Sequence, residues 1–113
     1  MNSAGRPKKC RSVKVDPRVV YFSPRGRPGR PDESQMSVDE YEAMRLADYL
    51  KQAQKAAAKD MGVSQQTFSR ILRQARFRMA DALINGKILR IQGGKYIVVS
   101  RDDFSAKPQE RRR

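Results

Sequence analysis

The sequence contains no histidine, no tryptophan and a single cysteine, Cys10. One cysteine cannot form an internal disulfide and is typical of a protein in a reducing compartment, so we expect a cytoplasmic protein. Without histidine the chain cannot build the usual tetrahedral zinc site by itself, and we expect no metal or other cofactor. It also lacks a serine-based catalytic motif and a phosphate-binding glycine loop, which predicts that it is not an enzyme.

Long apolar segments are absent as well. No run approaches the ~20 residues that a membrane-spanning helix needs. The basic start, MNSAGRPKKCRS, is not followed by the apolar stretch of a secretory signal. We therefore expect no membrane partner. Charged residues make up 33% of the 113 residues, so the core must be small and the chain long enough for one modest domain.

Positive charge is what the sequence has in excess, with a formal net charge of +13. Residues 1–31 hold nine Lys and Arg against one acid, residues 32–50 hold one against six, and residues 51–113 hold fifteen against five. Two strongly basic segments around an acidic one indicate a polyanionic partner, and with a membrane disfavoured this is nucleic acid.

The first 36 residues contain five of the six prolines, among them those of the run PRGRPGRP. Proline and glycine at this density exclude a helix. Residues 10–15 alternate polar and apolar side chains, and residues 19–22 are rich in β-prone residues. Each stretch is either a docked edge strand or part of a flexible arm. We define residues 1–36 as a basic, partly extended arm.

Three helices are predicted after the arm. Ser37 and Glu40 form a capping box that starts the first helix, which runs to Leu50 with its acidic side chains solvated. The Ala-, Lys- and Gln-rich residues 51–61 form the second helix, which Gly62 ends. The third helix, capped by Ser64, extends over residues 65–84, and Asn85-Gly86 closes it.

Two β-prone runs follow, residues 87–92 and 95–100, with Gly93-Gly94 between them. Such a pattern predicts a hairpin over residues 87–100, followed by a disordered basic tail over residues 101–113. The predicted fold class is therefore mainly α: a helix-turn-helix domain over residues 37–86, a small C-terminal β-hairpin and an extended basic N-terminal arm.

The second and third helices fit a helix-turn-helix motif, which spans residues 54–76. Its two helices cross steeply and need a small residue at their contact, and Ala58 has this position. Gly62 lies at the turn, Val63 fills it, and Phe68 and Ile71 point inward from the second motif helix. An ordinary helical hairpin, which also needs alanine and glycine at these positions, is the alternative.

The third helix divides into an apolar and a polar face. The apolar stripe, predicted to be buried, consists of Phe68, Ile71, Leu72, Ala75, Met79 and Leu83. Gln and Arg can each pair bidentately with a base in the major groove, and the N-terminal part of this helix reads bases. The predicted DNA-binding residues are Ser64, Gln65, Gln66, Thr67, Ser69, Arg70, Arg73 and Arg76, with bases approached by Gln65, Gln66, Ser69 and Arg70 and phosphates held by Arg73 and Arg76.

The arm offers a second basic group, comprising Arg6, Lys8, Lys9, Arg11 and Lys14. These side chains either contact the DNA backbone or a minor groove, or belong to a solubilising tail. Cys10 lies among them, where nearby cations would favour the thiolate, and redox sensing is the alternative to an incidental cysteine.

Five segments in order, RPKKCRSV, VVYFSPRGRP, SVDEYEAMRLAD, MGVSQQTFSRIL and ADALINGKILRIQGG, resemble domain-of-unknown-function family 134. The resemblance covers residues 6–94. It implies a small prokaryotic protein of the kind described as DNA-binding, with a helix-turn-helix similar to region 4 of sigma factors; MGVSQQTFSRILRQAR corresponds to the turn and recognition helix. Lys51-Gln52-Ala53 departs from the family, whose members tend to have a capping serine there.

The predicted function is sequence-specific binding of double-stranded DNA, most simply in transcriptional regulation. Two alternatives remain open: a module that contacts RNA polymerase, as sigma region 4 does, and RNA binding through the basic arm. Because one recognition helix covers few base pairs, we also predict a homodimer, formed along the edge of the hairpin over residues 87–100. If the segment Val13–Phe22 occupies that edge instead, the protein is a monomer.

Overall fold

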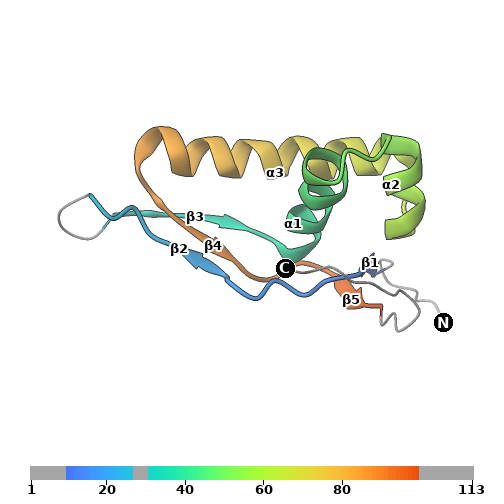
Figure 1. The fold of residues 1–113 in the computed structure, drawn as a ribbon, viewed down its shortest axis with the longest axis horizontal. Coiled ribbons are helices and arrows are strands. Elements are labelled where there is room, and N and C mark those ends of the chain that lie inside the picture. Colours follow the sequence, from blue (N-terminus) through green and yellow to red (C-terminus); the bar gives the residue numbers. More distant parts are fainter. Residues whose placement is uncertain (1–9, 27–30, 100–113) are drawn as a thin grey trace.

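The computed structural model describes residues 10–26 and 31–99. In chain order the elements are β1 (Arg11–Val13), β2 (Tyr21–Phe22), β3 (Glu33–Met36), α1 (Val38–Met44), the π-helical segment η1 (Arg45–Tyr49), α2 (Gln54–Met61), α3 (Gln65–Asn85), β4 (Ile88–Ile91) and β5 (Tyr96–Val98). The long helix α3 lies over the sheet of β2, β3 and β4, and α1 and α2 pack near its N-terminal end (Figure 1).

The expectation of a mainly α fold is wrong. Within the described ranges, five strands form two sheets, so the fold mixes helix and sheet. In the larger sheet β4 is central, antiparallel to β2 and parallel to β3. In the smaller sheet β1 and β5 run parallel. Parallel pairs need a long crossover connection, and the helical segment between β3 and β4 supplies it.

The predicted hairpin over residues 87–100 does not form, because β4 and β5 belong to different sheets. The two glycines between them serve another purpose. Gly93 accepts a hydrogen bond from the backbone N–H of Val38, and Gly94, with φ +100°, lies directly against Ser37 and Asp39. The glycines thus let the chain pass closely over the start of α1. They do not form the tight turn that would have reversed the chain direction into a hairpin.

In the described part of residues 1–36, the docked strand is the alternative that forms and the flexible arm is not: β1 and β2 lie within residues 10–15 and 19–22, and β3 is a further strand that was not predicted. Val13 of β1 and Met36 of β3 are fully buried. The other predictions for this region, and the predicted tail, concern residues 1–9, 27–30 and 100–113, which lie outside the described residues.

The helices begin and end close to the predicted positions. Ser37 and Glu40 form the capping box in both directions, with Oγ accepting from Glu40 N at 3.3 Å and Oε1 accepting from Ser37 N at 3.0 Å. Gly86, with φ +62°, ends α3. The second helix starts later than expected, at Gln54, and its N-cap Ala53 has no side chain that can bond the free N–H groups.

Acidic residues of α1 are buried, although the sequence suggested a solvated face. Glu42 is fully buried and accepts hydrogen bonds from Arg45 Nε at 2.8 Å, Arg45 Nη2 at 3.0 Å and the backbone N–H of Lys14 at 3.1 Å. Burial lowers the pKa of Arg45, but the hydrogen bond and charge of Glu42 outweigh it and the pKa is raised. The hydrogen bond from Lys14 thus connects the residue after β1 to α1.

The hydrophobic core has two parts. One joins the helices and consists of Ala43, Leu46, Ala57, Ala58, Met61, Phe68, Ile71 and Leu72. The other joins α1 and α3 to the strands and consists of Val13, Met36, Val38, Ala75, Ala82, Leu89 and Ile91. The first core holds α2 against the N-terminal half of α3, and the second fixes the C-terminal half of α3 on the sheet.

Candidate nucleic-acid interface

Helices α2 and α3 are joined by a turn of three residues. Gly62 adopts a left-handed conformation, with φ +71° and ψ 32°, which a residue with a Cβ adopts only at a cost. Its N–H and that of Val63 bond to the last carbonyls of α2, those of Lys59 and Ala58. Ser64 then caps α3, because its Oγ accepts from the N–H of Thr67 at 3.0 Å. The turn is thus fixed by local hydrogen bonds on both sides.

Tertiary packing sets the position of α3 relative to α2. Ala57, Ala58 and Met61 of α2 are buried in the same cluster as Phe68 and Ile71 of α3, and Val63 packs partly buried against that cluster. Small side chains at Ala57 and Ala58 let the two helices approach closely. The inward residues expected for the motif are therefore the ones that the structure brings together.

The opposite face of α3 is polar and accessible. Gln65, Gln66, Arg70 and Arg73 are exposed, and Thr67 and Ser69 are partly exposed. Four of the predicted residues line one polar hollow of about 370 Å³, namely Gln66, Thr67, Arg70 and Arg73. The N-terminal half of α3 thus gathers hydrogen-bond donors and acceptors, together with positive charge that an anionic ligand could contact.

Arg76 has a different environment from the other predicted residues. It donates to both carboxylate oxygens of Asp48, from Nη2 at 2.7 Å and from Nε at 3.1 Å. The hydrogen bond from Arg76 holds the pKa of Asp48 below its usual value. Arg76 is therefore engaged within the protein, one turn beyond the hollow.

The described residues of the arm group contribute to the fold. Arg11 pairs with the buried carboxylate of Asp39 at 3.0 Å, and Lys14 pairs with Asp60 at 3.3 Å. These pairs attach β1 to α1 and α2, away from the hollow on α3. Cys10 is exposed. Arg6, Lys8 and Lys9 lie outside the described residues.

Two basic residues of α2 were missed in the sequence interpretation. Lys55 and Lys59 are exposed and four residues apart, so they lie on one face of α2. Together with Arg70 and Arg73 they occur in none of the ion pairs found among the described residues. Their i, i+4 spacing was the available signal.

Two other classes of site have no counterpart in the described part of the chain. No group of three or more His, Cys, Asp or Glu side chains is placed to hold a metal ion. No helix there is both long and apolar enough to cross a membrane.

Comparison with known proteins identifies the family. Residues 1–99 match the family model described as protein of unknown function DUF134. A UPF0251 protein of Prosthecochloris aestuarii is 48% identical over 95% of this chain and 70% of its own length. A UPF0251 protein of Caldicellulosiruptor bescii is 51% identical over 81% of this chain and 64% of its own length. One from Dehalococcoides mccartyi is 46% identical over 85% of this chain and 83% of its own length. No solved structure matches significantly. The chain therefore belongs to the DUF134 family of proteins of unknown function.

Proposed function

We propose that this protein binds double-stranded DNA in a sequence-specific manner and regulates transcription, with α2, the turn and α3 acting as a helix-turn-helix. The N-terminal half of α3 enters the major groove. Gln65, Gln66, Ser69 and Arg70 approach base edges, because Gln matches adenine and Arg matches guanine. Arg73 and the turn at Ser64 face the phosphates that flank the groove.

The polar hollow on α3 is the observation that carries this proposal. Gln66, Thr67, Arg70 and Arg73 line it together, on the face opposite the buried Phe68 and Ile71. In an ordinary helical hairpin only the packed, inward face of the helix is constrained, and nothing would favour a cluster of such side chains on the outer face. Gln and Arg are residue types that can read adenine and guanine in the major groove, and a second arginine beside them can hold a phosphate.

Among the described residues, the ion pairs leave out the basic residues of α2 and of the N-terminal half of α3. Asp39, Asp48, Asp60 and Asp81 pair with basic residues outside α2 and the N-terminal half of α3. Lys55 and Lys59, on α2, therefore keep their charge available for a polyanion, in the position where the first helix of such a motif crosses the DNA backbone. Arg76 reaches a phosphate only by exchanging Asp48 for it, so we assign it a secondary role.

The test begins with selection of bound sequences from a random duplex library, followed by affinity measurements on the selected site. We expect Arg70→Ala to weaken binding by about 1–3 kcal/mol and to relax the preference at one base position. Arg90→Ala is the matched control. It removes the same charge, but Arg90 pairs with Glu33 and stacks on Tyr21 on the sheet face away from α3.

Two results would reject the assignment. One is an unchanged consensus and affinity for Arg70→Ala; the other is an equal loss for Arg70→Ala and Arg90→Ala, which would indicate attraction by total charge alone. Competition between duplex DNA and single-stranded RNA completes the experiment. Stronger competition by the RNA would show that the basic surface serves RNA instead.

A further inference from the structure

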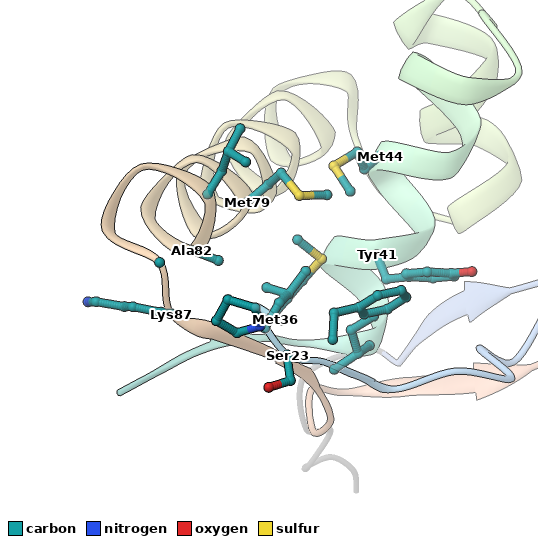
Figure 2. Close-up of a pocket in the computed structure, with 13 residues that line it drawn as sticks. Ser23, Met36, Tyr41, Met44, Met79, Ala82 and Lys87 are labelled. Carbon is teal, nitrogen blue, oxygen red and sulfur yellow. The ribbon is translucent and has the colours of Figure 1, made fainter. Parts of the chain in front are cut away.

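A groove of about 380 Å³ lies at the other end of α3 from the polar hollow (Figure 2). Its floor is formed by the strand residues Met36, Leu89 and Ile91. Met79 and Leu83 of α3 form one wall and Phe22 of β2 forms the other. Side chains of α1 close one end. The groove thus uses the gap between a helix and the edge strand of the sheet beneath it.

Polar groups of the described lining residues point away from the groove. The ammonium group of Lys87 extends outward to Asp81, with which it pairs at 3.0 Å. The hydroxyl of Ser23 and that of Tyr41 lie at the periphery and face outward in Figure 2. What remains inside is hydrocarbon, aromatic ring and thioether, the last from Met36, Met44 and Met79.

The apolar stripe of α3 is incompletely covered at this groove. The sequence predicted that Met79 and Leu83 are buried, and four other members of the stripe, from Phe68 to Ala75, are. Met79 is instead 38% exposed and Leu83 76% exposed. Both side chains face the groove, so α3 presents core-type residues to a space that no described side chain fills.

We propose that this groove binds a small, uncharged hydrophobic molecule that carries an aromatic ring. Its volume lies in the range of about 300–1,000 Å³ found for small-molecule sites. Methionine side chains adapt to irregular ligands and make favourable sulfur contacts with aromatic rings. An uncharged ligand is favoured, because the described side chains inside the groove offer no partner to a charge that is buried there.

The dimensions favour a small molecule over a second copy of the chain. A stable protein interface buries about 800 Å² on each partner. The exposed lining of this groove is much smaller, and α3, β2 and α1 bound it on three sides. The proposal does not depend on DNA binding, since the groove and the polar hollow share no residue.

The test uses the full chain and the uncharged fluorescent probe N-phenyl-1-naphthylamine. We expect saturable one-to-one binding with an increase in fluorescence. Leu83→Gln places a polar group in the groove wall and should weaken probe binding about tenfold or more. Ile84→Gln is the matched control, because Ile84 is equally exposed, at 77%, on the next position of α3 but does not line the groove.

The results of this experiment distinguish a small ligand from a second copy of the chain as the occupant of the groove. A selective loss in Leu83→Gln, with unfolding midpoints of both variants equal to that of the wild type, supports the ligand site. Absence of saturable binding, or an equal effect of both substitutions, overturns it. A wild-type dimer that Leu83→Gln converts to a monomer in sedimentation would also overturn it, because a second copy would then occupy the groove.

Discussion

Phe68 is the residue on which the contact between α2 and α3 most depends. It is fully buried at the centre of the helical core. Phe68→Ala should lower the free energy of unfolding by roughly 3–5 kcal/mol, since it leaves a cavity in a small core. Denaturant titration measures this. Phe77→Ala, on the same helix but 57% exposed, should cost far less; similar losses for the two variants would mean that the assigned face of α3 is incorrect.

Gly94 is required for a different reason. A Cβ at this position would meet the Asp39 carboxylate and the Ser37 side chain, and φ is +100°. Gly94→Ala should therefore destabilise the protein by more than about 1 kcal/mol. In Gly26→Ala the added methyl group meets nothing within 4 Å, so its thermal midpoint should stay near that of the wild type. A stable Gly94→Ala protein would show that the crossing over α1 can widen.

The pair of Asp48 and Arg76 gives a pH dependence. Arg76 lowers the pKa of Asp48 in the folded protein, so the carboxylate stabilises the fold above the unfolded pKa of about 3.9. This contribution is lost as pH falls through the lower, folded pKa. Asp48→Asn should cost about 0.2–1 kcal/mol at pH 7, because the pair is partly solvated, and progressively less below pH ~4.

Unfolding by urea at several pH values tests this, with Asp16→Asn as the control. Asp16 is exposed and takes part in none of the ion pairs of the described residues. A cost of Asp48→Asn that does not change with pH would indicate that the substitution acts through packing and not through the carboxylate charge.

At the scale of elements, the helices could be predicted because their signals are local. The capping box of Ser37 and Glu40, the left-handed Gly62 and the closing Gly86 each act within a few residues of themselves. The polar face of α3 followed from the same periodicity. This is why the residues of the hollow, Gln66, Thr67, Arg70 and Arg73, could be named from the sequence.

The pairing of the strands could not be predicted in this way. Gly93-Gly94 between two β-prone runs has the form of a hairpin, but β4 pairs with Glu33–Met36, more than fifty residues earlier. Short strands take their partners from burial against the rest of the molecule, which no local pattern contains. The groove was missed for the same reason. Met79 and Leu83 have the helical spacing of core residues, but no described part of the chain packs over them.

At the scale of the whole molecule, the helical segment depends on both ends of the chain. Val13, Met36, Leu89 and Ile91 of the strands complete the second core around Ala75 and Ala82. A fragment of residues 37–86 should therefore not fold cooperatively. Circular dichroism during thermal unfolding is the measurement; a sigmoidal transition in the fragment would show that the first core is sufficient.

The predicted homodimer needs another surface than the hairpin edge, because β4 has a neighbouring strand on each side. In the described part of the chain β5 pairs only with β1, and Ile97 and Val98 are about half exposed. Val13 pairs with β5 and Tyr21–Phe22 pairs with β4, which is the arrangement for which a monomer was the stated alternative. A dimer would have to form along the other edge of β5, where Ile97→Lys would prevent it. Light scattering at micromolar concentration decides: a wild-type mass near 12.9 kDa, with and without DNA, would exclude the dimer.

The parallel pairing of β1 with β5 has a consequence for synthesis of the protein. Arg11 of β1 lies opposite Tyr96 of β5 in the parallel pair, so the first described strand can pair only after the last described one has been synthesised. On the ribosome the emerging chain would carry helices and unpaired strands until residue 98 has left the exit tunnel. Such long-range pairing slows folding and exposes strand edges meanwhile. Pairing of the last described strand is thus the closing step in forming the described fold.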